Sequence, residues 1–171
     1  MSLARVRALV VLGLLVLMAA VAAGWAIAKD SETAAPPATP CVKSTVPFST
    51  ALPRRAADVR VNVYNATSRI GLATTVADEL EARDFAVGRI GNDPLQQTVE
   101  APVQIRYGPA GAGAAQMLRA WFAGAEPTLD NRTDGTVDLV LGIRYEGFTT
   151  PTDHAIAVAR LGQPTRPPEL C

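Results

Sequence analysis

The spacing of hydrophobic residues changes partway through the stretch 59–85. Val59, Val61 and Val63 alternate with polar residues, and a period of two is typical of a strand with one buried face. After Gly71 the apolar residues recur with helical spacing. The expected buried stripe of this helix comprises Leu72, Ala73, Val76, Ala77 and Leu80. The pattern predicts a strand that leads through a tight polar turn into a helix that folds back on it.

The turn between these two elements is built from short polar residues. Asn65, Thr67 and Ser68 carry side chains that bond readily to nearby backbone groups. Asn65, Thr67 and Gly71 also form a second candidate binding surface, although turn geometry explains these residues equally well.

The next part of the chain repeats this alternation more loosely. Further strands are predicted at 86–90, 103–107, 125–129 and 137–141. A second helix opens at 108–111 and ends at Gly124. The order strand, helix, strand, strand, helix, strand, strand predicts an α+β fold. Its economical packing is a two-layer sandwich with a mixed β-sheet and both helices on one face.

The segment 1–29 differs from the rest in hydropathy. Residues 8–28 carry no charge, and roughly 20 apolar residues span a bilayer. With Arg5 and Arg7 on the cytoplasmic side, we expect one transmembrane helix, a single-pass protein of the cell membrane and an extracytoplasmic domain. The alternative is a signal peptide cleaved near 26–28, where Ala-Ile-Ala offers a suitable site. The remainder would then be secreted.

Composition divides the remaining chain into three parts. Residues 30–57 are a linker and arm rich in Pro and Ala, which favours an extended spacer. Residues 58–148 form the domain, and 149–171 form a tail that ends in Cys. Within the tail, 155–161 fits either a short strand or a helical turn.

The two cysteines, Cys41 and Cys171, lie on either side of the domain. Disulfides persist outside the cytoplasm, so we expect one bridge between them, worth roughly 4–5 kcal/mol in the chain-entropy model. The alternative is two separate thiols. With one histidine and no C-x-x-C spacing, no metal site is expected.

Charge excludes some classes of partner. Lys plus Arg and Asp plus Glu both number 16, so no basic footprint for nucleic acid or polybasic membrane surface is present. The glycines at 108, 111 and 113 lack the Lys and the spacing of a P-loop, so turn formation and close helix packing explain them better. No cofactor is expected.

Catalytic residues are not evident either. Ser68 is the only serine of the domain and has no G-x-S-x-G around it. His154 is the only histidine, and its neighbour Asp153 would point elsewhere in a strand. We interpret His154 as a surface residue of the tail, and we expect a protein that is not an enzyme.

One set of polar residues suits a binding site. Opposite the predicted buried positions lie Arg60, Asn62, Tyr64, Gln104 and Arg106. If the first and third strands are neighbours, these residues share one open sheet face that suits a sugar, an anionic glycopolymer or a partner protein. The alternatives are a solvated face or a face covered by the arm 42–52.

The chain also carries a family resemblance. Residues 61–73 read V-x-V-x-N-A-T-x-x-x-G-L-A, and the helix after them ends near R-D-F-x-V. Together with Tyr107-Gly108-Pro109 and the run 138–142, this order resembles the LytR C-terminal domain family over about 59–148. Members usually have Gly where this chain has Ala66.

The resemblance implies a role in maintaining the bacterial cell envelope. In the longer proteins of this family the domain follows a catalytic phosphotransferase domain, which is not in this sequence. We therefore expect a non-catalytic extracytoplasmic module that binds a cell-wall glycopolymer or an envelope-assembly protein. The alternative is an accessory or regulatory subunit of a separate glycopolymer ligase. The oligomeric state stays open.

Overall fold

A computed structural model describes residues 7, 12–22, 45–167 and 170 of the chain. The chain divides into two units, 1–40 and 41–171, and in the first of them residues 12–22 are helical. None of the helices described is both long and apolar enough to cross a membrane. Much of the predicted anchor 8–28, together with both cysteines of the predicted disulfide, lies outside the described residues.

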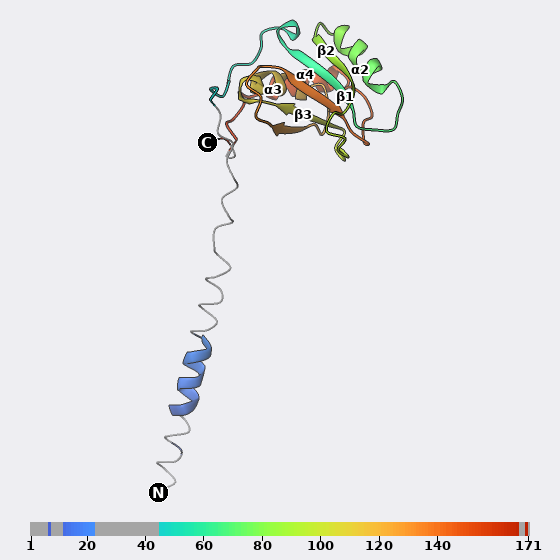
Figure 1. Cartoon of the computed structure of the whole chain (residues 1–171). Coiled ribbons are helices and arrows are strands. Elements are labelled where there is room, and N and C mark those ends of the chain that lie inside the picture. Colours follow the sequence, from blue (N-terminus) through green and yellow to red (C-terminus); the bar gives the residue numbers. More distant parts are fainter. Residues whose placement is uncertain (1–6, 8–11, 23–44, 168–169, 171) are drawn as a thin grey trace. The chain divides into compact units, whose positions relative to one another are not determined.

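The second unit contains one mixed sheet of five strands in the order β2-β1-β5-β3-β4 (Figure 1). The strands are β1 (Arg60–Asn65), β2 (Ala86–Asn92), β3 (Val103–Tyr107), β4 (Glu126–Leu129) and β5 (Val137–Leu141). β1 runs parallel to β2 and β5, whereas β3 is antiparallel to β5 and parallel to β4. The predicted order of elements along the chain and the mixed sheet are confirmed.

The first and third strands are not neighbours, because β5 lies between them. Each strand–helix–strand unit, β1-α2-β2 and β3-α3-β4, pairs its own two strands in parallel. This leaves one edge of β1 and one edge of β3 free, and the last strand pairs with both. The shared polar face was predicted on the condition that the first and third strands are neighbours, and this condition is wrong.

Helices α2 (Leu72–Glu81) and α3 (Ala112–Arg119) both contribute to the main hydrophobic core. The sheet contributes alternate residues of β1, β3 and β5, such as Val61, Ile105 and Leu139, and these are fully buried. All five residues of the predicted α2 stripe are buried. Because both helices share one core with one set of strand residues, they lie on the same face of the sheet.

The second helix is shorter than the sequence predicts. It follows the 3-10 turn η2 (Pro109–Gly111) and ends at Arg119, so Trp121 and Phe122 lie in the turn beyond it. A Cβ at Gly113 would collide with the carbonyl group of Ala51. The close helix packing predicted for the glycines at 108, 111 and 113 is thereby confirmed at Gly113, which lies within α3.

The arm before the sheet packs near α3. The N–H of Ser49 donates to the carbonyl oxygen of Pro109 at 2.9 Å, and Phe48 packs against the main core. A short 3-10 turn, η1 (Ala56–Asp58), then leads into β1. The described part of the arm therefore lies beside η2 and α3, and the alternative in which it covers the second sheet face is wrong for 45–52.

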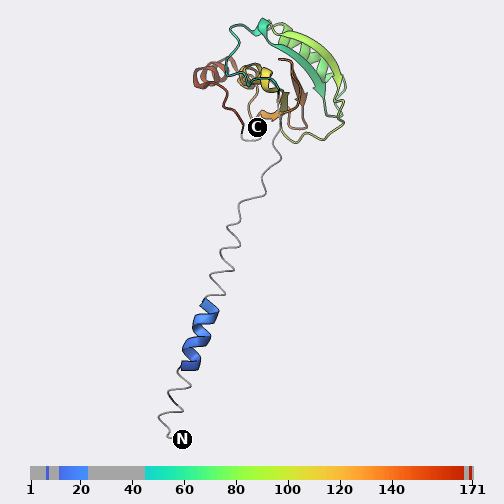
Figure 2. The same cartoon turned by 60° about the vertical axis from the view of Figure 1, so that its left-hand side comes forward.

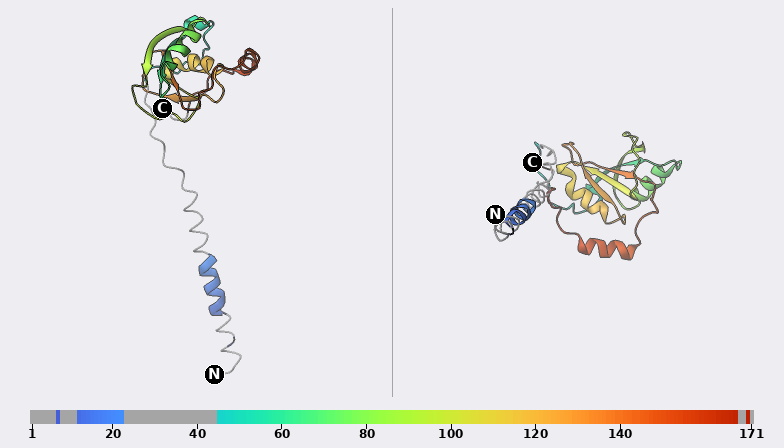
Figure 3. Two further views of the ribbon diagram at one scale, coloured as in Figure 1. Left: turned by 90° about the vertical axis from the view of Figure 1, so that its right-hand side faces the viewer. Right: turned by 90° about the horizontal axis from the view of Figure 1, so that it is seen from below.

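The tail contains a helix, α4 (Pro151–Arg160). Thr150 caps it by accepting a hydrogen bond from the N–H of Asp153, and Pro151 occupies the first turn, where it is well tolerated. Figure 2 and Figure 3 show α4 on the outer side of α3, away from the sheet. None of its residues is fully buried, so α4 contributes little to the core.

A loop crosses the second face of the sheet. Residues 93–101, which we call the strap, join β2 to β3. Val99 and Ala101 of the strap form a small second cluster with Tyr64 and Val140. The strap therefore covers one part of this face and leaves another part open.

Candidate functional site

The open part of the second sheet face forms a hollow of about 540 Å³, which we call the basin. It is lined by Arg60, Asn62, Tyr64, Gly88, Arg89, Asp130, Arg132, Asp134, Thr136 and Asp138. These residues come from β1, β2, β5 and the loop between β4 and β5. The lining holds three arginines and three aspartates, which makes the basin polar and formally balanced in charge.

A β-bulge shapes one wall of the basin. Val61 pairs with Val87 and Val63 with Ile90, so Asn62 alone lies opposite both Gly88 and Arg89. The side-chain oxygen of Asn62 accepts a hydrogen bond from the N–H of Arg89 at 2.9 Å. A Cβ at residue 88 would collide with that oxygen, so glycine permits the close approach.

Asn62 also fixes the middle of the basin. Its amide nitrogen donates to Oδ1 of Asp138 on the neighbouring strand β5 at 2.7 Å. Both ends of this amide are therefore committed to neighbouring strands. Asn62 therefore has a structural role in the basin, and its amide is not free to bind a ligand.

Arg132 forms the far wall. Its guanidinium contacts Oδ2 of Asp130 and Oδ2 of Asp138, each at 2.6 Å. Burial on its own would lower the pKa of Arg132, but hydrogen bonds to the two carboxylates raise the pKa overall. The two aspartates and this arginine therefore form a fixed, hydrogen-bonded group with two negative charges and one positive charge.

Asp134 is occupied by its own turn. It accepts hydrogen bonds from the N–H of Thr136 at 2.8 Å and from the hydroxyl of Thr136. These bonds lower the pKa of Asp134, with a smaller contribution from the charges of Arg132 and Arg60. This carboxylate is thus ionised and turned toward the loop.

Three polar groups of the basin remain available. Arg60 and Arg89 are exposed, and their guanidinium groups make no hydrogen bond or ion pair with the described part of the chain. Tyr64 is only 9% exposed, with its ring among strap and β5 residues. Its hydroxyl makes no hydrogen bond with the described residues. Every fully buried polar side-chain atom among the described residues has a partner. The hydroxyl of Tyr64 is therefore not fully buried, and it is open to the basin.

The predicted face residues fall into two groups. Arg60, Asn62 and Tyr64 all line the basin. Gln104 and Arg106 lie apart from them beneath the strap, and Arg106 is only 5% exposed. Gln104 accepts a hydrogen bond from Nε of Arg106 at 2.7 Å. The structure therefore does not place Arg106 where a ligand could reach it.

Arg106 holds the strap through Asp93. Its two terminal nitrogens lie 2.6 and 3.0 Å from the two carboxylate oxygens. Burial alone would raise the pKa of Asp93, but hydrogen bonds from Arg106 and from the N–H groups of Leu95 and Gln97 hold the pKa below its usual value. The pair is buried and fully bonded, which suits a structural role.

The second candidate surface is a well-bonded turn. The side chain of Asn65 accepts from the N–H and the hydroxyl of Thr67, at 2.9 and 2.8 Å, and donates to the carbonyl oxygen of Arg69 at 2.7 Å. Gly71, at φ 76°, begins α2 in the left-handed region that favours glycine. Turn geometry accounts for all three predicted residues of this surface.

Several residues of the basin were absent from the prediction. Asp138 alternates with buried Val137 and Leu139, so the period of two already places it on the polar face. The run N-R-T-D-G at 131–135 is typical of a turn, and this pattern alone does not indicate a binding role. The sequence pattern does not indicate that Arg89 lies on the polar face, because a bulge shifts the alternation by one residue.

The two residues considered as possible catalytic groups, Ser68 and His154, lie in different parts of the domain. Ser68 lies in the turn after β1, whereas the imidazole of His154 on α4 stacks on the indole of Trp121, with 3.5 Å between ring centroids. His154 is half-buried, so its interpretation as a plain surface residue is wrong. Burial and the charge of Arg83 lower the pKa of His154. Across 45–167 and the other described positions, no cluster of His, Cys, Asp and Glu could hold a metal ion.

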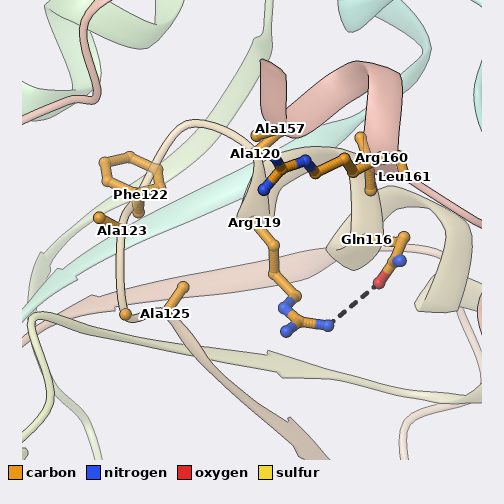
Figure 4. Close-up of a pocket in the computed structure, with 10 residues that line it drawn as sticks. Gln116, Arg119, Ala120, Phe122, Ala123, Ala125, Ala157, Arg160 and Leu161 are labelled. Atoms are coloured by element: carbon orange, nitrogen blue, oxygen red, sulfur yellow. Dashed lines mark hydrogen bonds between the residues drawn. The ribbon is translucent and has the colours of Figure 1, made fainter. Parts of the chain in front are cut away.

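A second hollow, of about 360 Å³, lies between α3 and α4. Figure 4 shows its residues, with Arg119 bonded to Gln116 and the guanidinium of Arg160 pointing to a different side. Both arginines are the last residues of their helices, where a cation complements the helix dipole. This explains them without a ligand, so the basin is the stronger candidate.

Comparisons with known proteins point to the cell envelope. The sequence model of the LytR C-terminal family, described as "LytR cell envelope-related transcriptional attenuator", matches residues 58–145. The chain is 32% identical over 111 residues to Cell envelope integrity protein Cei of Mycobacterium tuberculosis. That alignment covers 64% of this chain and 51% of the relative, so the chain spans about half the length of that protein.

A solved structure is also similar. It is the soluble domain of a conserved hypothetical secreted protein from Mycobacterium marinum, with 29% sequence identity and a TM-score of 0.56. The match covers 70% of this chain and 86% of the other.

Proposed function

The chain belongs to the LytR C-terminal family, and we propose that it serves the cell envelope as a non-catalytic extracytoplasmic module that binds a cell-wall glycopolymer in the basin. The family and the envelope integrity relative support the envelope-related role. The polymer and the binding mode are our proposal, and an N-terminal anchor in the membrane is part of it.

The observation that carries the proposal is the arrangement of polar groups in the basin. Its volume of about 540 Å³ falls within the range of ligand pockets, roughly 300–1,000 Å³. Asn62, Arg132 and Asp138 are fixed by hydrogen bonds between strands and loop. A sugar is recognised through many hydroxyl groups, and a rigid site with both donors and acceptors suits such a ligand.

Co-sedimentation with purified cell-wall sacculi tests this function. The full chain, kept in mild detergent, is expected to pellet with the sacculi, and free wall fragments are expected to compete it away. An unrelated protein of similar size in the same detergent is the control. Recovery no greater than that of the control would remove the polymer-binding proposal.

A second candidate is an accessory role beside an envelope-assembly protein, such as a separate glycopolymer ligase. It is favoured by three exposed aliphatic residues, Ile70, Leu95 and Ile143. They follow β1, β2 and β5, which are parallel neighbours whose carboxyl ends are in register at one edge of the sheet. Apolar residues gathered at one edge suit contact with a protein.

In-cell photo-crosslinking separates this candidate from the first. A crosslinker at Ile70 is expected to capture one discrete envelope protein if the accessory role holds. A crosslinker at Ile156, an exposed aliphatic residue of α4, is the matched control. Equal products from both positions would contradict a dedicated protein contact at the sheet edge.

A further inference from the structure

We infer that the basin contains an anion subsite, in which Arg60, Arg89 and the hydroxyl of Tyr64 bind an oxyanion of an acidic wall polymer, either a phosphodiester or a carboxylate. This inference rests on the proposed function and names the chemistry of its ligand. It concerns only the part of the basin beside β1 and β2.

The charged side chains of the basin differ in whether they have partners. Arg132 is shared between Asp130 and Asp138, and Asp134 is bonded within its own turn. Arg60 and Arg89 are left with no direct ion pair among the described residues. Guanidinium groups bind carboxylates and phosphates through two parallel hydrogen bonds, so two unpaired groups at one hollow favour an oxyanion.

The β-bulge in β2 determines the direction in which Arg89 points. Val63, on the helix-covered face, pairs with Ile90. Without the extra residue in β2, Val63 would instead lie opposite Arg89, and the guanidinium would be directed toward the helices. The bulge moves Arg89 to the open face, and bulges often re-aim a side chain in this way next to functional sites.

The bulge is also specifically supported. Asn62 accepts a hydrogen bond from the N–H of Arg89, and Gly88 leaves the space that this contact needs. A polar side chain and a glycine are thus both committed to holding this geometry. An ordinary parallel pair of strands needs neither residue. Asn62 and Gly88 therefore serve to hold Arg89 in this position.

Tyr64 is held rigidly. Its ring is packed against Val99, Ala101 and Val140, while its hydroxyl makes no hydrogen bond with the described residues and lies at the basin. Binding therefore orders no additional ring, and a fixed donor is gained at little entropic cost. Together with the two arginines it adds a third donor to the lining of the basin.

Treated sacculi test the subsite with the full chain in detergent. One batch is stripped of phosphodiester-linked polymers with hydrofluoric acid, and a second has its carboxylates amidated. Loss of binding on the first batch alone identifies a phosphodiester, and loss on the second alone identifies a carboxylate. Undiminished binding to sacculi that have received both treatments would overturn the anion subsite while leaving polymer binding intact.

Matched variants link the result to the basin. The double variant Arg60→Gln with Arg89→Gln is expected to weaken binding to untreated sacculi roughly tenfold or more, because charge-assisted hydrogen bonds are lost. The double variant Arg119→Gln with Arg160→Gln makes the same change in charge at the second hollow, and it is expected to bind like the wild type. Equal binding by both double variants would overturn the subsite. Failure of the wild type to bind untreated sacculi would overturn the proposed function with it.

Discussion

The guanidinium of Arg106 and the carboxylate of Asp93 form a two-point ion pair beneath the strap, with nitrogen–oxygen distances of 2.6 and 3.0 Å. Both side chains are almost completely buried. The pair ties the start of the strap to the centre of β3. It therefore sets the limit between the covered and the open part of the second sheet face.

Removing one partner of this pair is expected to destabilise the domain. In the variant Arg106→Met the carboxylate of Asp93 is left buried and uncompensated, which costs about 3–5 kcal/mol of unfolding free energy. Urea denaturation of the full chain, followed by circular dichroism, measures the loss. Arg144→Met is the control, because Arg144 is exposed and reaches the carbonyl group of Glu100 in the same strap. A midpoint equal to that of the control would contradict the structural role of Arg106.

The same pair predicts a loss of stability in acid. The pKa of Asp93 is lowered in the folded protein, so its contribution is complete above the ordinary aspartate value of about 3.9 and disappears as pH falls through the lowered pKa. Thermal unfolding between pH 5 and pH 2 is expected to show this decline. The variant Asp93→Asn should start less stable and decline less steeply, and an unchanged slope would contradict the assignment.

Gly88 is expected to be irreplaceable for basin geometry. In Gly88→Ala the new methyl group collides with the side-chain oxygen of Asn62, so Asn62 must shift and its hydrogen bond from the N–H of Arg89 is lost, at a cost of about 0.5–1.5 kcal/mol. Binding to sacculi should fall together with stability, since the bulge that directs Arg89 is disturbed. Gly91→Ala, in the same strand but with no neighbour near its Cβ, is the control. Full binding by Gly88→Ala would show that the bulge is unimportant.

Docking of α4 is expected to depend on pH. The pKa of His154 is lowered by burial and by Arg83, so the neutral imidazole is favoured where it stacks on Trp121. This contribution is complete above about pH 6.5, the ordinary histidine value, and is lost as pH falls through the lowered pKa. Hydrogen exchange of the α4 amides should therefore accelerate in acid relative to those of α2, after correction for intrinsic exchange rates.

His154→Phe provides the control for this effect. It keeps an aromatic ring against Trp121 but cannot gain a proton. Exchange at α4 in this variant should no longer depend on pH beyond the intrinsic rates. A pH dependence that survives the substitution would assign the effect to another group.

The elements of the domain could be predicted because each has one buried face. The alternation around Val61 and the helical stripe around Val76 are local patterns, and both residues lie in the core as expected. Helix α4 was also within reach, since Thr150, Pro151 and Asp153 form an N-terminal capping signal. None of its residues is fully buried, so no buried stripe identified it as a helix of the core.

The candidate site was harder to predict because it depends on long-range pairing. The position of β5 between β1 and β3 follows from contacts between distant parts of the chain. The alternation of β3 places Arg106 on the polar face, where an exposed side chain is expected. Arg106 is nevertheless buried, because Asp93 and the strap cover it. A regular alternation in β2 would direct the side chain of Arg89 toward the core, and the extra residue of the bulge directs it to the open face instead. Neither change leaves a trace in local hydropathy.

Protein-observed nuclear magnetic resonance tests most directly whether the basin binds wall polymer. The isotope-labelled full chain in micelles is titrated with soluble fragments of purified wall, and backbone amide shifts are recorded. Shifts are expected to gather at Arg60, Asn62, Tyr64 and Arg89 and in the loop 130–136, with little change in α4. Shifts confined to the sheet edge that carries Ile70 and Ile143, or no shifts at saturating fragment, would contradict binding in the basin.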